Sequence, residues 1–379
     1  MRSHKSRLIA VLIAAVMLLS LAACGGTKPS GDGDVYDAAF AQFDAKDKVV
    51  TGDDIAMTWE QLFFFLARTY KDSITASGVD AFYADTDAGK ALRQSVLDDS
   101  IEYAMQLAAV ERKARAQGFT LTEEQLAALE VQFASYLENN TTETTSAESL
   151  LWSYFHATLD EFKYVNTVNT LKYLLVKEKY ASALAVTDEQ IEDYFSEAEV
   201  FHAKHILLMT VDSATRQPLS AAEIAAKRVL ANEVLTKLAA FDGDDFDAYF
   251  TDLMVQYNED NGEPLTGYTF TTKQMVSEFE NATRDLALGH YTPQYVESTY
   301  GYHIIYRLPL DYDMTILQQQ DTMRDTVKLE LAMASFDEML NDEIEQLTPN
   351  LTLAAKLKTI DLATLFPRDK ADITFSAAN

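Results

Sequence analysis

The chain has little cysteine, few histidines and little positive charge, and each shortage excludes a class of function. Cys24 is the single cysteine among 379 residues, so neither an internal disulfide framework nor a thiolate metal cluster is possible. The six histidines show no His-x-x-x-His spacing, so we expect no metal site and no cofactor. Lys and Arg number 31 against 59 Asp and Glu, which argues against a nucleic-acid partner because phosphates need a basic footprint.

A long apolar run is also missing, and the apolar start of the chain is typical of an export signal. The apolar segment from Leu8 to Leu21 follows a basic start and is shorter than the roughly 20 residues that cross a bilayer. It ends in Leu-Ala-Ala-Cys-Gly-Gly at 21–26, which resembles a bacterial lipobox; the alternative is an ordinary secretory signal with an incidental cysteine. We expect a signal peptide over 1–23, a lipid anchor at Cys24, a flexible tether over 24–34, and a place on the extracytoplasmic face of the cell membrane.

Helix-starting patterns are abundant in the first half of the chain. A capping box places Ser or Thr three residues before Glu or Gln at the start of a helix. Four such pairs occur: Thr58 with Gln61, Thr122 with Gln125, Thr158 with Glu161, and Thr187 with Gln190. We therefore expect residues 35–196 to be helical after one small strand near 49–55, with a long helix over 87–117 that Gly118 ends.

The run Phe63-Phe64-Phe65 is too apolar for one narrow face of a helix. It predicts either a buried helix that is covered on two sides or an exposed patch that binds unfolded chains. We favour the buried helix because large apolar side chains are mostly packed inside proteins.

The segment from His202 to Leu308 opens and closes with short apolar strands, each of which contains a histidine. Between them, helical patterns predict the order β-α-α-β-α-β-β, which resembles the parvulin family of peptidyl-prolyl isomerases. The strands are expected at 201–209, 267–270, 296–298 and 303–308, and the helices at 220–240, 246–253 and 275–286. The resemblance implies an α+β fold with a parvulin-like domain, in which helices surround a four-stranded sheet.

The flanking regions resemble SurA- and PrsA-type foldases. In proteins of this kind a C-terminal helix packs onto the N-terminal helices, and the isomerase domain is inserted between them. The resemblance therefore implies an all-α SurA-N-like chaperone domain over 35–196, a parvulin-type domain over 197–309, and a returning helix with a tail over 310–379. The helical pattern of the last part begins at Ile316.

The same resemblance assigns the candidate site. It implies catalytic roles for the paired strand histidines and one acidic residue, which are His205, His303 and Asp260. It implies a proline pocket that contains Met275 and Phe279, with Tyr268 and Phe270 as plausible lining. Without the resemblance, each residue has a plainer interpretation: a core histidine, a solvated acid or ordinary apolar packing. His202 lies on the opposite side of an alternating strand from His205 and is expected to be incidental.

Isomerisation needs no bond to break. Rotation about an X–Pro bond has a barrier of about 20 kcal/mol because twisting removes amide resonance. A site must bind the twisted amide better than either planar form, and an apolar pocket for the proline ring with polar groups near the carbonyl suffices. Two neighbouring imidazoles can also fix each other's tautomer by a hydrogen bond.

The leading hypothesis is an isomerase and foldase whose partners are unfolded or newly secreted proline-containing polypeptides. One alternative is a holdase-type chaperone with a catalytically inactive parvulin domain. A solute-binding lipoprotein is disfavoured because residues 34–196 show no βαβ alternation. The sequence departs from the family at 264–267, Pro-Leu-Thr-Gly, where glycines are usually more frequent, which puts the shape of this turn in doubt.

Overall fold

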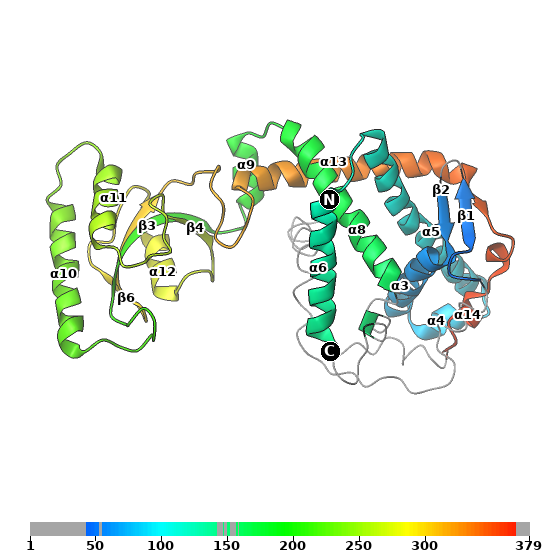
Figure 1. Cartoon of the computed structure of the whole chain (residues 1–379), viewed down its shortest axis with the longest axis horizontal. Helices are drawn as coiled ribbons and strands as arrows, with labels where there is room; N and C mark the ends of the chain where they lie inside the picture. The colour runs from blue at the N-terminus through cyan, green and yellow to red at the C-terminus, as the bar shows by residue number, and fades with distance from the viewer. Residues whose placement is uncertain are drawn as a thin grey trace. The chain divides into compact units, whose positions relative to one another are not determined.

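The computed structural model describes residues 43–368, except 53–54, 142–146, 148–149, 152–156 and 158. The expected signal peptide over 1–23, the anchor Cys24 and the tether over 24–34 lie outside the described residues. The chain divides into two compact units, one of which joins the residues up to Ser182 with those from Ala332 onward, while Ala183–Leu331 form the other (Figure 1). Within the described residues, no helix has the length and apolar character that a bilayer crossing requires.

The first unit is built mainly from helices. They are α3 (Trp59–Ser77), α4 (Val79–Tyr83), α5 (Asp87–Ala116), α6 (Glu123–Asn140), α8 (Leu159–Leu175) with a π-helical turn Val176–Tyr180, the C-terminal part of α13 (Met323–Leu347), and α14 (Leu362–Leu365). Both expected capping boxes at the starts of α3 and α6 are formed, with Thr58 and Thr122 as N-caps. The expected cap Thr158 lies outside the described residues. Gly118, just after α5, has the left-handed conformation that ends a helix (φ +60).

The expectation of a single small strand in this region was wrong. The first unit has a three-stranded antiparallel sheet in the order β2-β1-β7, made of β1 (Lys48–Gly52), β2 (Ile55–Thr58) and β7 (Thr352–Leu353). The third strand contributes two residues from the far end of the sequence. No local pattern identifies so short a strand, because its pairing with β1 depends on the tertiary fold.

The aromatic run of α3 is buried on two sides, as expected. Phe63 and Phe65 are buried, and Phe64 packs against a separate apolar cluster of α6 and α8. On the opposite side, Phe63 and Tyr70 both stack on Phe366, with ring centroids 5.9 and 4.3 Å apart. The aromatic residues of α3 therefore form part of the hydrophobic core.

The second unit contains the four-stranded antiparallel sheet that the sequence predicts. Its strands are β3 (Val200–Met209), β4 (Tyr268–Thr271), β5 (Val296–Glu297) and β6 (Gly301–Leu308), in the order β4-β3-β6-β5. Its helices are α9 (Asp188–Phe195), α10 (Ala221–Ala239), α11 (Phe246–Tyr257) and α12 (Ser277–Asp285). The order β-α-α-β-α-β-β from β3 onward is confirmed. Thr187 forms the expected capping box at the start of α9.

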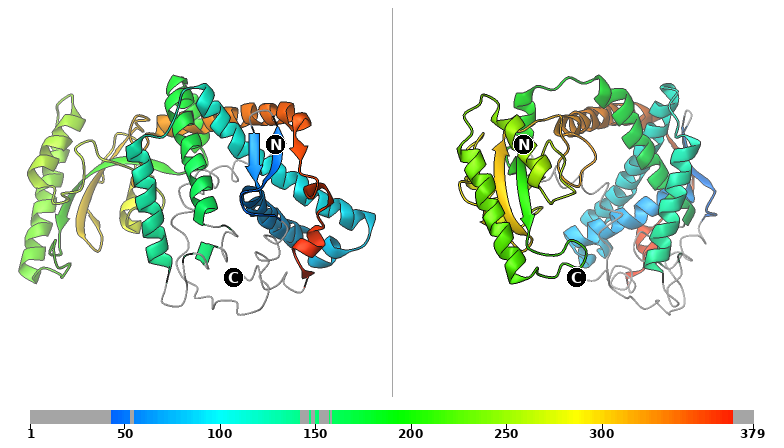
Figure 2. Two further views of the ribbon diagram at one scale, coloured as in Figure 1. Left: turned by 45° about the vertical axis from the view of Figure 1, so that its right-hand side comes forward. Right: turned by 60° about the vertical axis from the view of Figure 1, so that its left-hand side comes forward.

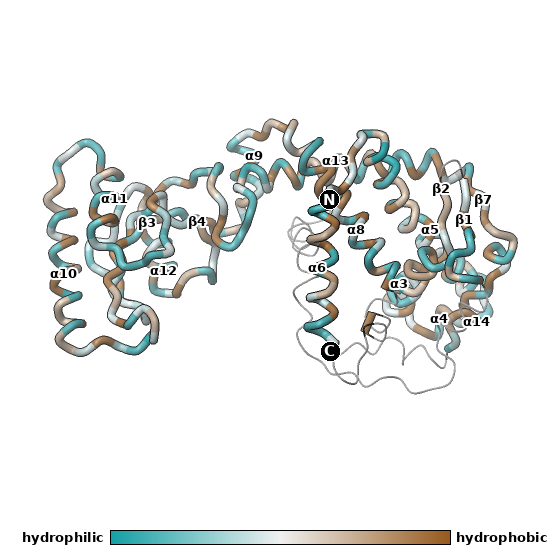
Figure 3. Tube along the Cα trace, viewed as in Figure 1, coloured by the Kyte–Doolittle hydropathy of each residue, from teal (hydrophilic) through white to brown (hydrophobic). Residues whose placement is uncertain are grey.

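Helices cover the two faces of this sheet unequally (Figure 2). Helices α10 and α11 pack on one face, against Ile206, Ile304 and Tyr306. Helix α12 packs on the other face, where Phe279 contacts Ala203 and Ile305. Hydrophobic and hydrophilic residues are interspersed along α10 (Figure 3), and Ala231, Val234 and Leu238 are the ones it buries.

Two helices begin later than their apolar patterns predict. The expected start of α12 at Met275 was wrong, because Gln274 closes a turn on Thr271 and Lys273 has a positive φ of 70°, so the helix begins at Ser277. The expected start of α13 at Ile316 was also wrong. The backbone N–H of Leu317 donates to the Thr269 carbonyl at 2.6 Å, so this segment runs beside β4 before the helix begins.

Candidate active site

The register of the two central strands brings the paired histidines together. His205 on β3 lies opposite Ile305, and His303 on β6 lies opposite Leu207, so the two histidines are diagonal neighbours on one face of the sheet. Both side chains are buried, and their ring centroids are 5.3 Å apart. The backbone register of β3 and β6 therefore places the two histidines side by side without help from side-chain contacts.

The segment Asn258–Glu263 docks against the edge of β3 that β4 leaves uncovered. Three side-chain oxygens accept backbone N–H groups of alternate β3 residues: Glu263 Oε1 from His205 at 2.9 Å, Asn258 Oδ1 from Leu207 at 2.8 Å, and Glu259 Oε2 from Met209 at 2.7 Å. The backbone N–H of Glu259 donates to the Leu207 carbonyl at 2.9 Å. These bonds position the acidic segment beside His205.

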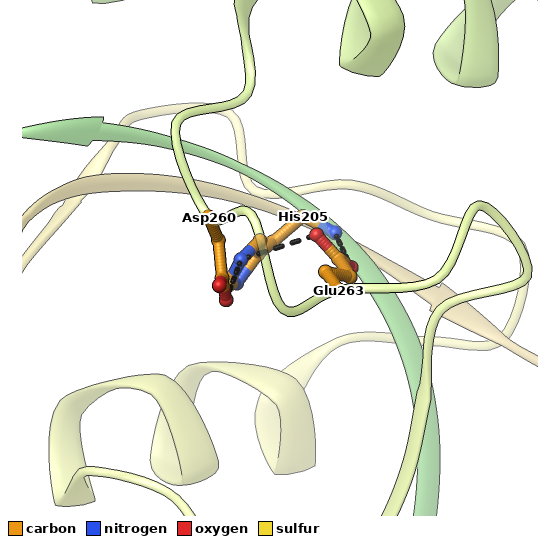
Figure 4. A group of neighbouring side chains, drawn as sticks. All are labelled: His205, Asp260 and Glu263. Carbon is orange, nitrogen blue, oxygen red and sulfur yellow. Dashed lines mark hydrogen bonds and ion pairs between the residues drawn. The ribbon is translucent and has the colours of Figure 1, made fainter.

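Two carboxylates converge on the same nitrogen of His205. Its Nε2 lies 3.2 Å from Asp260 Oδ2 and 3.2 Å from Glu263 Oε2 (Figure 4). Among the described residues, neither nitrogen of this ring has a hydrogen-bond partner in good alignment, although Nε2 is in close contact with both carboxylates. The structure therefore places a second acid, Glu263, beside the predicted Asp260.

The two carboxyl groups differ in acidity because their surroundings differ. The adjacent His205 ring holds the pKa of Asp260 below its ordinary value, against the opposing effect of partial burial. Burial raises the pKa of Glu263 to about 7, although His205 opposes this shift. Near neutral pH, Asp260 is therefore ionised, whereas Glu263 is present in both its protonated and its ionised form.

His303 is a neutral imidazole held by a serine. Burial, followed by the nearby His205, lowers the pKa of His303 to about 3. Its Nε2 hydrogen-bonds with Ser298 Oγ at 2.7 Å, and that oxygen also accepts the backbone N–H of Tyr300 at 3.1 Å. The hydrogen bond that two neighbouring imidazoles can form is not made here, because Ser298 is the partner of His303 Nε2.

The predicted pocket residues gather beside the histidines. The Phe279 ring meets His205 and His303 edge-on, with centroids 5.1 and 5.6 Å away. Phe270 is buried 5.7 Å from Phe279, centroid to centroid, and Met275 packs half-buried in the same cluster. Met275 lies before α12 rather than within the helix expected over 275–286, and it still belongs to one cluster with Phe279.

Tyr268 connects the apolar cluster to the acidic one. Its hydroxyl donates to Asp260 Oδ2 at 3.3 Å, and its ring centroid lies 6.1 Å from that of His205. Burial and the neighbouring Asp260 raise the pKa of the Tyr268 hydroxyl, which therefore stays protonated. Tyr268 thus lies between the apolar cluster around Phe279 and the carboxylate of Asp260.

The glycine-poor turn still forms. The Gly267 N–H donates to the Pro264 carbonyl at 2.8 Å, and Gly267 has a positive φ of 86°. A Cβ at this position would lie 2.5 Å from the Ala203 carbonyl oxygen, so glycine is required here. One glycine is therefore enough to close the turn beside β3.

His202 lies outside the cluster, as expected, and has a structural contact. Its two ring nitrogens lie 2.8 Å from the carbonyl oxygens of Pro309 and Thr266. The sequence interpretation missed Asn258, Glu263 and Ser298. The spacing of Glu263 from Asp260, three residues with Gly262 between them, is the signal that could have indicated a turn returning a second carboxylate.

The segment that contains this site is similar to a known domain family. Residues 190–307 match the model of the PPIC-type PPIase domain. This segment is a parvulin-type domain. It covers both histidine strands, the acidic segment and α12, and it begins within α9.

Relatives of the parvulin-type domain include foldases. The chain is 31% identical over 183 residues to the foldase protein PrsA of Halalkalibacterium halodurans, covering 47% of each chain. It is 28% identical over 176 residues to PrsA of Levilactobacillus brevis, covering 45% of this chain and 49% of the relative. The chain thus spans about half the length of the curated relatives it matches.

Solved structures with similar elements include PrsA of Bacillus subtilis, with 19% identity and a TM-score of 0.24 over 88% of this chain and 100% of that one. A SurA-like chaperone structure from Campylobacter jejuni has 18% identity and a TM-score of 0.24, over 79% of this chain and 96% of that one.

Proposed function

We propose that the parvulin-type domain catalyses cis–trans isomerisation of X–Pro bonds without forming a covalent intermediate. The observation that carries this proposal is the convergence of His205, Asp260 and His303 on one sheet face, directly beside the Phe279 ring. Apolar rings offer a surface for the proline ring, and the polar groups lie where the amide would sit. These are the two ingredients that stabilisation of a twisted amide requires.

Charge is the second part of the mechanism. Twisting the amide removes its resonance, so the carbonyl and the nitrogen change their charge distribution along the reaction. Asp260 holds a fixed negative charge beside His205, while His303 stays neutral because burial disfavours its charged form. Charges and dipoles that are already in place favour the twisted amide over the planar forms without reorganising during the reaction.

We further propose that the protein acts as a lipid-anchored foldase on newly secreted chains outside the cytoplasmic membrane. The lipobox-like segment ending at Cys24 supports this proposal, as does the foldase name of the PrsA relatives. X–Pro isomerisation takes tens of seconds without a catalyst and limits the folding of proline-containing clients. Metabolic labelling with a radioactive fatty acid tests the anchor, since Cys24→Ser should abolish incorporation.

The direct test of the chemistry is an isomerisation assay on proline peptides. His205→Ala and Asp260→Ala should each lower the catalysed rate by at least about tenfold, because each removes a polar group beside the amide. His290→Ala, an exposed histidine of the same domain, is the matched control and should leave the rate unchanged. A wild-type protein no faster than buffer, or variants as fast as wild type, would disprove the mechanism.

A chaperone that holds clients without isomerising them is the second candidate. The helical unit has a hollow of about 320 Å³, whose lining combines apolar side chains such as Phe65 and Leu107 with polar and charged ones such as Glu111 and Arg112. An aggregation assay with a proline-free client separates the candidates. Equal suppression of aggregation by wild type and Asp260→Ala, with no isomerase activity in either, favours the holdase.

A further inference from the structure

We propose that His205, Asp260 and Glu263 form a binding site for a divalent transition-metal ion, with Zn²⁺ as the best-fitting ion. This site is a second property of the same cluster, and it does not depend on isomerase activity. One side chain comes from β3 and the other two come from the acidic segment. A short sequence motif therefore does not reveal the site.

The donor atoms have the separations that a tetrahedral ion needs. One ligand atom from each residue lies within 4.8 Å of the other two. His205 Nε2 is 3.2 Å from each nearest carboxylate oxygen (Figure 4). Zinc bonds of roughly 2.0–2.2 Å at tetrahedral angles place neighbouring ligand atoms about 3.3–3.6 Å apart. An ion therefore fits between these groups with small side-chain movements.

The His205 ring is a second, independent indication of a ligand. Its side chain is 5% exposed, and among the described residues its Nε2 has only the two nearby carboxylates, neither in good hydrogen-bond alignment, while its Nδ1 has no aligned partner. Buried polar atoms without partners are rare and costly. The ring points its Nε2 at the two carboxylates, and an ion there would give all three groups a strong partner.

The ligands are held in place by other bonds, as metal sites require. Glu263 accepts the His205 backbone N–H at 2.9 Å and the Asn258 amide at 2.8 Å. Asp260 accepts the Gly262 N–H at 3.0 Å and the Tyr268 hydroxyl at 3.3 Å. These contacts orient the carboxylates before an ion arrives.

The chemistry of the donors selects the type of ion. Calcium and magnesium prefer all-oxygen sites, whereas an imidazole nitrogen with two carboxylates suits zinc and other transition metals. Three protein ligands leave a fourth position for water. The Asp260 side chain, 28% exposed, offers solvent access on its side, while the side chain of Glu263 is fully buried.

Isothermal titration of the purified chain with ZnCl₂ at pH 7.5 tests the site. Saturable one-to-one binding is expected. Glu263→Gln and Asp260→Asn should each weaken the affinity by at least about tenfold, because each replaces a charged ligand with an amide. Asp252→Asn is the matched control, since it removes the same charge from an exposed position of the neighbouring helix α11, and it should bind like wild type. Cobalt absorption in the visible range provides a second readout of tetrahedral geometry.

The outcome is independent of the proposed isomerase chemistry, because binding is measured without substrate. Circular dichroism checks that each variant is folded; should Glu263→Gln unfold, Asp260→Asn decides, because, within the described residues, the bonds of the Asp260 side chain do not include the backbone of β3, unlike those of Glu263. No saturable binding by folded wild type would overturn the site, and so would equal affinities in wild type and both variants. Binding without catalysis would reject the isomerase proposal and leave the metal site standing.

Discussion

The two faces of the four-stranded sheet are both buried, yet they are built from different side chains. The face under α10 and α11 is mainly apolar, with Ile206 and Ile304 fully buried beside Phe250 of α11. Its buried Lys204 is paired with Asp247 of the same helix. The face beside α12 holds His205 and His303, buried to a similar degree but poorly supplied with hydrogen bonds.

The two faces of the sheet therefore have different roles: one mainly stabilises the fold, and the other holds the candidate site. Burial of apolar side chains stabilises the fold, whereas buried polar groups without full hydrogen bonding reduce stability. Alternation along β3 assigns neighbouring residues to opposite faces, so Ile206 packs while His205 lies in the cluster. One strand therefore serves the core and the site at once.

The largest expected effect comes from the apolar face. Phe250→Ala removes a fully buried ring from the cluster of α10, α11, β3 and β6 and should lower the free energy of unfolding by about 3–5 kcal/mol. Urea denaturation measures this change. The isomerase rate per folded molecule should stay within twofold of wild type. A rate loss without a stability loss would mean that the two faces are not separate.

The next effect concerns the polar face and depends on pH. Because the pKa of Glu263 is raised from 4.5 to about 7, the protonated group contributes stability that is present below pH 4.5 and is lost as the pH rises through 7. Glu263→Gln cannot titrate. Relative to wild type, its free energy of unfolding should therefore increase from pH 4.5 to 8, by up to about 3 kcal/mol at roughly 1.4 kcal/mol per pKa unit.

His303 provides a check, because its effect on the free energy of unfolding should depend on pH in the direction opposite to that of Glu263. Its pKa is lowered from 6.5 to about 3, so the neutral ring contributes stability that is present above pH 6.5 and lost as the pH falls through 3. His303→Phe should therefore gain stability relative to wild type on acidification. Urea denaturation at several pH values in chelator-containing buffer measures both variants. Parallel pH profiles for the two variants would contradict these assignments.

A smaller effect is expected at Phe279, where apolar side chains lie against the two histidines. Phe279→Leu keeps an apolar side chain under the histidines and should cost about 1 kcal/mol of stability. It removes the flat ring that we propose for contact with proline, so KM should rise more than kcat falls. Isomerisation kinetics at varied peptide concentration separate the two constants. An unchanged KM would remove Phe279 from the pocket.

The smallest effect should come from a helix end that takes no part in the site. Ser220 caps α10 in a capping box with Glu223. Ser220→Ala should lower stability by about 1 kcal/mol and leave isomerisation unchanged. Thermal unfolding followed by circular dichroism measures the loss. A change in KM here would show that α10 communicates with the opposite face.

The elements that the sequence predicted well are those with strong local signals. The apolar strand at 201–209, the capping boxes at Thr58, Thr122 and Thr187, and the helix stop at Gly118 all depend on neighbouring residues. Local hydrogen bonds and periodicity are enough to specify them. The expectation that the strands form one four-stranded sheet followed from resemblance to a family rather than from these signals.

The features that the sequence did not predict depend on contacts between distant residues. β7 forms only because it pairs with β1, and Ile316 leaves the helical pattern because its segment runs beside β4. Glu263 lies in the site because its carboxylate binds the backbone of His205, 58 positions away. Its sequence neighbourhood looks like an ordinary acidic turn, so the missing information was tertiary rather than local.

The docking of Asn258, Glu259 and Glu263 on β3 has a consequence for how this protein can meet unfolded chains. An open strand edge invites another extended chain to join the sheet, which is a route to aggregation. Here side-chain oxygens occupy the N–H groups of alternate β3 residues, so no client backbone can pair there. At this edge, a protein with the proposed foldase function is thereby shielded from strand addition by its clients.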